Sequence, residues 1–261
     1  MTLQRLPVVV ETPQHAGLGD ALDYESEQAL APGTLVRVPL GKREVAGIVW
    51  HGVGRAAADV TLRPLAQCLD AMPPLPPQWL ALVEFAAGYY QRGLGELALA
   101  VLPPELRKLD ASQLAQRVRR LLKRLKAPDP PPGEPALPKL NDEQAKALAA
   151  VIAATPPAPP MLLHGVTGSG KTEVYLRAAA HVLDAGHQAL MLVPEINLTP
   201  QLLGRVSARF PARRVVAMHS GLTPAQRLQT WLLAHLGLAD IVLGTRLAVF
   251  APELKREIQL A

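Results

Sequence analysis

Cysteine, aromatic residues and long apolar runs are all scarce in this sequence. Cys68 is the one cysteine among 261 residues, which excludes an internal disulfide framework and a zinc site built on several cysteines of this chain. Aromatic residues make up 4% of the chain, so we expect cores of leucine, valine and alanine. No apolar run approaches the ~18 residues of a membrane span, and the start MTLQRLPVVVET is too interrupted for a signal peptide. We therefore expect a cytoplasmic protein without membrane contact.

Positive charge is concentrated in a single segment. Residues 105–126 hold eight lysines and arginines against two acids, whereas the rest of the chain holds 19 basic and 20 acidic side chains. Such a concentration suits contacts with nucleic-acid phosphates, and a solvated helix face is an equally good account of the charge alone. The segment also predicts an amphipathic helix, because its apolar residues recur at helical spacing: Leu114, Val118, Leu121, Leu122 and Leu125.

The pattern of the chain changes across a proline-rich stretch. Residues 127–138 (APDPPPGEPALP) hold six prolines in twelve positions, which favours a stiff, extended linker. Before it, TLVRVPL and VAGIVWHG predict two strands joined by the turn GKRE, and two helices follow in PQWLALVEFAAGYYQR and GELALAVLPPEL. We expect Trp79, Tyr89 and Tyr90 of the first helix to lie in the core.

After the proline-rich stretch, strands alternate with helices, which is typical of a parallel sheet with helices on both faces. The expected strands are MLLHG, QALMLVP, RVVAMHS and DIVLGT. We therefore predict a multidomain protein with a small β-rich N-terminal domain and an α/β lobe that holds an incomplete parallel sheet. The predicted boundaries are 1–105 for the β-rich domain, 106–138 for the basic helix and linker, and 139–261 for the lobe.

The octapeptide GVTGSGKT, residues 165–172, matches the Walker A phosphate-binding loop in full. Its glycines let backbone amides face phosphates, and the helix that follows adds its positive N-terminal end. Lys171 is expected to reach the β and γ phosphates, and Thr172 to ligate Mg²⁺, so both are predicted catalytic residues. Upstream, Asn141 is a helix cap, and the amide of Gln144 is placed to recognise adenine. The predicted ATP-binding residues are Gln144, Gly165, Val166, Thr167, Gly168, Ser169, Gly170, Lys171 and Thr172.

Stretches around this loop resemble the first motor lobe of superfamily-2 helicases, and more closely the PriA family of replication-restart helicases. They are LNDEQ, HGVTGSGKTEVYL, LVPEINLTPQ, MHSGLT and IVLGTRLAVFAP, within residues 139–252. The resemblance implies a RecA-like lobe that uses ATP and Mg²⁺. It also implies backbone or interlobe contacts for Glu195, while helix capping is the alternative role for Thr199. The residues that it assigns to DNA are Thr199, Gln201, Gly244, Thr245 and Arg246.

The stretch LDYESEQALAPGTLVRVPLGKREVAGIV resembles the start of the 3′-end-binding domain of the same family. By that resemblance, Asp23, Gly41 and Arg63 line a pocket for the last nucleotide of a nascent strand. A carboxylate accepts the proton of a free 3′-hydroxyl and repels a terminal phosphate, while a basic side chain holds the preceding phosphate. Leu22 stands where the family often has an aromatic residue. Taken alone, Asp23 is a turn residue.

The resemblance implies replication restart at stalled forks, with ATP-dependent 3′→5′ unwinding in an intact protein at the nucleoid. The implied partners are forked and single-stranded DNA, other primosome proteins and single-stranded DNA-binding protein. Zinc is expected only in a family module outside this chain. We expect the Walker B acidic cluster beyond Ala261 and therefore no hydrolysis by this chain alone, and whether it is a fragment or naturally short stays open.

Two other functions compete with this interpretation. One is a fork-binding platform without ATPase or helicase activity. The other is a P-loop enzyme of a different class, such as a small-molecule kinase, which PEINLTPQ and GTRLAVFAP disfavour.

Overall fold

A computed structural model describes residues 3–12, 21–52, 61–125, 137–154, 159–194, 198–252 and 257–260, the last four by backbone only. Most of the predicted linker and Glu195 lie outside the described residues. By its internal contacts, the chain divides into two compact units. The first unit is residues 1–126, 220–236 and 250–254, and the second is 127–219, 237–249 and 255–261. The domain boundaries predicted from the sequence remain a prediction.

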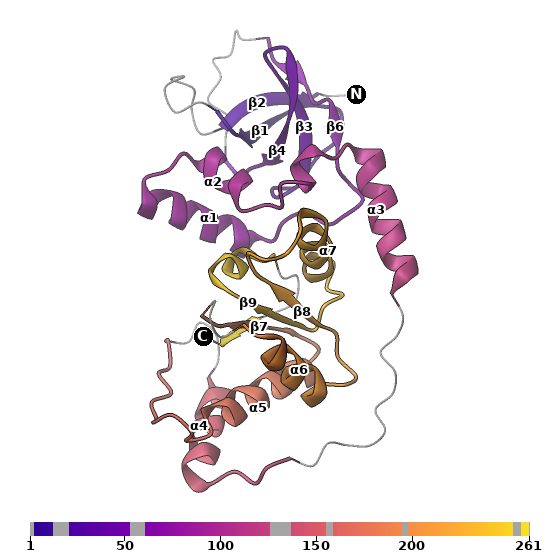
Figure 1. The fold of residues 1–261 in the computed structure, drawn as a ribbon. Coiled ribbons are helices and arrows are strands. Elements are labelled where there is room, and N and C mark those ends of the chain that lie inside the picture. The colour runs from indigo at the N-terminus through magenta and orange to yellow at the C-terminus, as the bar shows by residue number, and fades with distance from the viewer. Residues whose placement is uncertain are drawn as a thin grey trace. The chain divides into compact units, whose positions relative to one another are not determined.

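The first unit contains a sheet that closes on itself (Figure 1). Its strand order is β5-β2-β1-β4-β3-β6, and the edge strands β5 and β6 are separated only by Leu65 and Ala66. The amides of these two residues donate to the carbonyls of Glu25 and Arg37, each at 2.9 Å, and so join both ends of the sheet. The strands are β1 (Gln4–Val10), β2 (Ala21–Ser26), β3 (Leu35–Leu40), β4 (Arg43–Val49), β5 (Arg63–Pro64) and β6 (Gln67–Cys68).

Alternation along the strands separates core from surface. Leu22 and Tyr24 pack with the valine core formed by β1, β3 and β4, so Asp23 between them points to the other face. The predicted hairpin is confirmed: β3 pairs with β4 from Leu35↔Ile48 to Leu40↔Arg43, around a turn at Gly41. Gly41 has φ 62°, a left-handed conformation that glycine adopts without strain.

In the described part of the first unit, four helices and one 3₁₀ turn accompany the sheet. The helix α1 (Pro77–Tyr90) buries Trp79, as expected, but Tyr89 and Tyr90 are 70% and 66% exposed. The expectation that these tyrosines lie in the core was wrong, because the buried face of α1 follows Trp79, Leu80, Val83, Ala86 and Ala87. The others are α2 (Leu94–Ala100), η1 (Leu106–Lys108), α3 (Ala111–Arg124) and α7 (Pro224–His235).

The basic helix forms as predicted, over α3. Asp110 and Gln113 make a reciprocal capping box at its start, which satisfies the first free amides of the helix. Leu114, Val118 and Leu121 are buried, whereas Leu122 is 50% exposed. The buried face is therefore narrower than the predicted one.

Helix α7 belongs to the first unit, although in sequence it lies between two strands of the second. Its last residue, His235, is fully buried, and the ring nitrogen Nε2 donates to the carbonyl of Pro73 at 2.8 Å. Burial lowers the pKa of this imidazole to about 4, against the favourable effect of its backbone hydrogen bonds.

The second unit is built around the parallel sheet β10-β7-β9-β8. Leu176 and Leu183 of α5 and Val206 and Phe210 at α6 pack on β7 and β9. Its elements are α4 (Asp142–Ala153), α5 (Lys171–Asp184), β7 (Gln188–Leu192), α6 (Pro200–Arg209), β8 (Val215–Met218), β9 (Ile241–Gly244), the 3₁₀ turn η3 (Arg246–Phe250) and β10 (Glu257–Leu260). A β-rich unit and an α/β lobe with a parallel sheet confirm the predicted fold class.

The lobe departs from the prediction at one strand. MLLHG, residues 161–165, forms no strand, and Met161 and Leu162 are 50% and 89% exposed. The edge of β7 where a preceding parallel strand usually pairs is occupied by β10, which the sequence analysis did not predict. None of the described helices is both long and apolar enough to cross a membrane.

Candidate nucleotide and DNA-end sites

The phosphate loop forms a tight turn that leads into α5. Gly168 and Gly170 have φ 85° and 81°, conformations that bring successive backbone amides round toward one side of the loop. Gly170 is the N-cap of α5, so the loop sits at the positive end of that helix. Thr172 is exposed in the first turn of α5. This geometry fits a phosphate cradle with a hydroxyl available to Mg²⁺.

Lys171 folds back over the loop. Its ammonium group donates to the carbonyls of Gly165 and Val166. Both acceptors are neutral, so a phosphate group is a stronger acceptor for the same cation. To bind the β and γ phosphates as predicted, the Lys171 ammonium group has to leave these two carbonyls.

Gln144 is bound on both ends of its amide. Its Oε1 accepts from the amide of Asn141 at 3.0 Å, in a capping box that confirms Asn141 as the N-cap of α4. Its Nε2 donates to the carbonyl of Ser169 at 3.1 Å. Gln144 therefore ties the start of α4 to the phosphate loop, and adenine recognition by this amide requires it to exchange one of these bonds.

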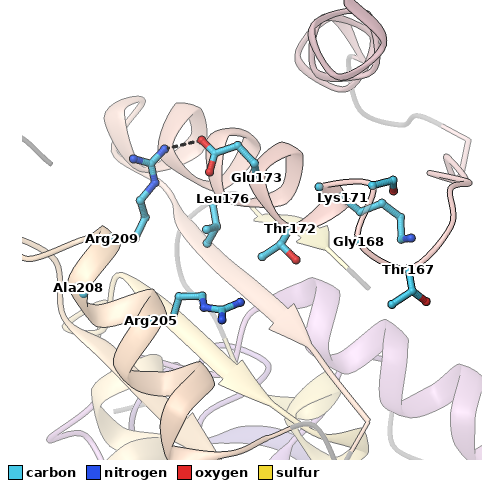
Figure 2. A pocket seen from close by; sticks show the side chains of 11 residues that line it. Thr167, Gly168, Lys171, Thr172, Glu173, Leu176, Arg205, Ala208 and Arg209 are labelled. Carbon is cyan, nitrogen blue, oxygen red and sulfur yellow. Dashed lines mark hydrogen bonds and ion pairs between the residues drawn. The ribbon is translucent and has the colours of Figure 1, made fainter. Parts of the chain in front are cut away.

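An open pocket of about 880 Å³ lies beside the loop, within the usual size range of ligand sites (Figure 2). One wall is the loop and the start of α5, and the other is α6, through Arg205, Ala208 and Arg209. Glu173 accepts hydrogen bonds from Arg177 at 2.9 Å and from Arg209 at 3.1 Å, so the charge of Arg209 is neutralised inside the wall. Arg205 is exposed and reaches from α6 toward Thr172. The sequence gives no local signal for Arg205, because only the packing of α6 beside α5 brings it to the loop.

The stretches LVPEINLTPQ and IVLGTRLAVFAP hold the residues of the lobe predicted to contact DNA, and β7 and β9 lead into them at the same edge of the sheet. Leu192 at the end of β7 pairs with Gly244 at the end of β9, and the amide of Val193 donates to the carbonyl of Gly244 at 2.9 Å. Ligand sites of open α/β sheets lie beyond this carboxyl edge. Thr199 caps α6 by accepting from the amide of Leu202, which is the alternative role considered for it.

The remaining motif residues differ in exposure. Gln201 and Arg246 are exposed, whereas Thr245 is buried and its amide donates to the carbonyl of Met218. A Cβ on Gly244 would lie 2.2 Å from that of Ala248, so this glycine is required by packing. The side chains placed for contact with a ligand are therefore Gln201 and Arg246.

Two of the predicted end-binding residues, Arg63 and Gly41, are in direct contact, and Asp23 lies on the strand next to Arg63. Arg63 of β5 lies opposite Tyr24 of β2, next to Asp23. The guanidinium of Arg63 donates to the carbonyl of Gly41 at 3.0 Å. Burial raises the pKa of the Tyr24 hydroxyl while the charge of Arg63 lowers it, and this hydroxyl donates to the carbonyl of Pro39. The three residues predicted from the resemblance thus occupy two neighbouring strands and the hairpin turn.

Asp23 has a cationic partner that the sequence did not reveal. Arg5 Nη2 lies 2.7 Å from Asp23 Oδ2, and this hydrogen bond raises the pKa of the arginine. The Asp23 side chain is only 3% exposed, while that of Arg5 is 34% exposed. Because β1 pairs Pro7 with Asp23 and Arg5 with Glu25, Arg5 is a diagonal neighbour of Asp23 on the same face. Only this register identifies Arg5.

The residues around the phosphate loop supply one predicted ligand for Mg²⁺, the hydroxyl of Thr172. The described residues contain no cluster of three or more histidine, cysteine, aspartate or glutamate side chains. One exposed hydroxyl beside a phosphate loop fits Mg²⁺ bound together with substrate phosphates, which is its usual mode in nucleotide sites.

Comparison with known proteins matches two segments of the chain to domain families. Residues 7–103 match the PriA 3′DNA-binding domain (3′BD), and residues 141–259 match the DEAD/DEAH box helicase family. A replication restart protein PriA of Treponema pallidum is 36% identical over 231 residues, which cover 86% of this chain. The chain belongs to the PriA family. PriA of Rickettsia felis is 29% identical over 88% of the chain, and PriA of Synechocystis is 53% identical over 35% of it.

The chain spans about a third of the length of the Treponema and Rickettsia PriA proteins, 33% in each case. Within that third it carries segments that match the PriA 3′DNA-binding domain and the DEAD/DEAH box helicase family. DNA binding and nucleotide use follow at the level of those two families.

Proposed function

We propose that this chain binds forked DNA at the 3′ end of a nascent strand and supplies the first motor lobe of an ATP-dependent 3′→5′ helicase. The observation that carries the proposal is that Asp23 and Arg63 lie on the adjacent strands β2 and β5 and that Arg63 contacts Gly41, within the segment that matches the 3′DNA-binding domain. In this proposal Arg63 holds the phosphate that precedes the last nucleotide, and Gly41 lets the strand approach the hairpin turn closely.

The burial of Asp23 accounts for discrimination between strand ends. With 3% of its side chain exposed and Arg5 on one oxygen, the carboxylate admits only a small donor. A 3′-hydroxyl donates a charge-assisted hydrogen bond there, which stabilises the complex. A 3′-phosphate is both larger and negatively charged, so it loses that bond and is repelled. Arg5 is then a positioning residue that holds the carboxylate in place.

The nucleotide part of the proposal rests on the pocket beside the phosphate loop. The amides of Thr167 to Thr172 and the ammonium of Lys171 bind the phosphates, and Thr172 holds Mg²⁺, which neutralises phosphate charge when bound. Arg205 contacts the nucleotide from α6, since it is the exposed cation of that wall. Glu173 is the one carboxylate among the described lining residues, and its two arginine partners leave it unsuited to orient the attacking water. We therefore expect nucleotide binding with very slow hydrolysis by this chain.

The proposed biological role is replication restart at stalled forks, in the cytoplasm at the nucleoid. Gln201 and Arg246 contact the translocating strand, together with the backbone around Thr199, Gly244 and Thr245. Other primosome proteins and single-stranded DNA-binding protein are the proposed protein partners. Support for this role comes from the PriA relatives and from the two domain matches.

The proposal is tested by binding to two forks that differ only in a 3′-hydroxyl or a 3′-phosphate on the nascent strand. We expect wild type to prefer the hydroxyl about tenfold, and Asp23→Asn to lose most of that preference. The matched control is Glu25→Gln, two residues along the same face of β2, which should retain it. Equal affinity of wild type for both forks would refute end recognition.

The same preparations separate a motor lobe from a platform. Wild type should bind an ATP analogue, and release of phosphate with DNA present should stay near background. Absence of nucleotide binding by wild type would favour the fork-binding platform without ATPase activity.

A further inference from the structure

The five cations of α3 fall into two sets on the helix surface. With 3.6 residues per turn, Arg117, Arg120 and Arg124 lie within about 60° of one another, along one flank of the buried face. Arg119 and Lys123 point away from that face. All five side chains are exposed, so exposure and charge type do not distinguish the sets. What distinguishes them is the neighbour: only the first set faces α7.

Arg117, Arg120 and Arg124 form one wall of a groove of about 220 Å³, and α7 forms the other. We call this the arginine groove. Figure 1 shows α3 and α7 as neighbouring helices of the first unit. Leu121, Leu228 and Leu232 make a buried apolar floor, which fixes the separation of the two helices. Ala225 and Gln229 of α7 complete the lining.

The groove carries positive charge without a balancing acid. Residues 111–124 and 220–236 contain no aspartate or glutamate. Among the described side chains, no recorded ion pair involves a cation of α3. Arg117 acts at longer range on Glu105, whose pKa is lowered mainly by its hydrogen bond with Lys108 and in small part by Arg117. Of the three groove arginines, Arg120 and Arg124 are therefore the two most available to an anionic ligand.

We propose that the arginine groove binds the phosphate backbone of double-stranded DNA. The inference rests on the proposed DNA-binding function and adds a second DNA site, independent of the strand end. The α-helical rise places Arg117 and Arg124 about 10 Å apart along the helix axis, about three phosphate intervals of one strand of B-DNA. Guanidinium groups bind phosphate oxygens in bidentate fashion. The groove belongs to the unit that holds the segment matched to the 3′DNA-binding domain.

Two variants of equal net charge test this proposal. Arg120→Gln with Arg124→Gln removes two cations from the groove, and Arg119→Gln with Lys123→Gln removes two from the opposite side of the same helix. The probe is a covalently closed duplex capped by a loop at each end, so that no 3′ end is present. Its dissociation constant is measured from about 50 to 200 mM salt.

The groove variant should lower the slope of log K against log[salt] by about 1.8, because each lost phosphate contact is worth about 0.9. The control variant should leave the slope within about 0.5 of wild type. Equal slopes for the two variants would overturn the proposal, since α3 would then act only through its net charge. Circular dichroism of both variants establishes that α3 and the sheet are retained.

A second variant approaches the groove from α7. Gln229→Glu places a carboxylate opposite the arginines and should weaken binding of the closed duplex several-fold, and more at low salt. Unchanged affinity would contradict a groove that includes α7. If a poly-glutamate peptide bound wild type, and the groove variant abolished that binding while duplex affinity stayed the same, the occupant would be an acidic peptide and the proposal would be wrong.

The outcome is separable from that of the proposed function. End recognition is measured on forks that differ at the 3′ terminus, and groove binding on a duplex without termini. In one possible outcome, wild type prefers a 3′-hydroxyl and the two double variants have equal salt slopes. That outcome would support end recognition and refute duplex binding by the arginine groove.

Discussion

The phosphate loop and the strand-end pocket are assembled in opposite ways. The loop is eight consecutive residues whose bonds are mostly local, such as Lys171 to the carbonyls of Gly165 and Val166. The proposed strand-end pocket draws on two separate contacts, that of Arg5 with Asp23 between β1 and β2 and that of Arg63 of β5 with Gly41 in a hairpin turn. A local site can be predicted from the sequence because its geometry follows from glycine positions and a helix start. A site made by strand register can be predicted only where a family resemblance indicates which residues take part.

Helix α7 also depends on a contact distant in sequence, because the partner of His235 is 162 positions away. The pKa of His235 is about 4 in the folded protein, below the ordinary value of 6.5. As pH falls from 6.5 to 4, the unfolded chain takes up a proton that the folded chain does not, so stability is present above pH 6.5 and is lost over that interval. At about 1.4 kcal/mol per unit, the loss approaches 3 kcal/mol.

Urea unfolding of wild type and His235→Gln at pH 7 and pH 4.5 measures this effect. The glutamine amide can donate to the Pro73 carbonyl but does not titrate, so the variant should lose less stability on acidification. His181→Gln, at an exposed position of α5, should behave as wild type. Parallel losses in all three proteins would mean that His235 is not buried neutral.

Lys171→Ala tests the local site. Removal of a charge-assisted contact to phosphate costs about 1.5–3 kcal/mol, so nucleotide affinity should fall about 10- to 100-fold. Binding of the 3′-hydroxyl fork should be unchanged, because the strand-end pocket is built from other elements. Fluorescence titration with a labelled ATP analogue and with labelled fork measures both in one preparation. A loss of fork binding would break the independence of the two sites.

Arg5→Gln is the finer test of assembly by register. It leaves the Asp23 carboxylate without its 2.7 Å partner, and we expect preference for a 3′-hydroxyl fork to fall about three- to fivefold. In an Asp23→Asn background the same substitution should have no further effect. If the effects of Arg5→Gln and Asp23→Asn on the preference add independently, Arg5 does not act through Asp23. The control Arg5→Lys keeps the positive charge and so distinguishes loss of charge from loss of fold.

Prediction from the sequence succeeded where the signal was local. It failed where packing against another element determined burial or strand pairing. The helix cap at Asn141, the hairpin around Gly41 and the helix over α3 follow from short-range chemistry. Tyr89 and Tyr90 are large aromatic residues of the kind that often lie in a core. They are exposed because the face of α1 that contains Trp79 is the buried one. The strand expected at residues 161–165 is absent for a comparable reason, because β10 takes the edge of β7.

By itself, the sequence determined a phosphate loop, a basic helix and two kinds of domain, because glycine placement, helical periodicity and charge act over a few residues. It also fixed Asp23, Gly41 and Arg63 as candidates through resemblance to the PriA family. Only the tertiary structure decided that Arg5 neutralises Asp23, that Arg205 reaches the nucleotide pocket, and that three of five α3 cations share a groove with α7. Each of these depends on strand register or helix packing, which join residues that no short stretch of sequence contains together.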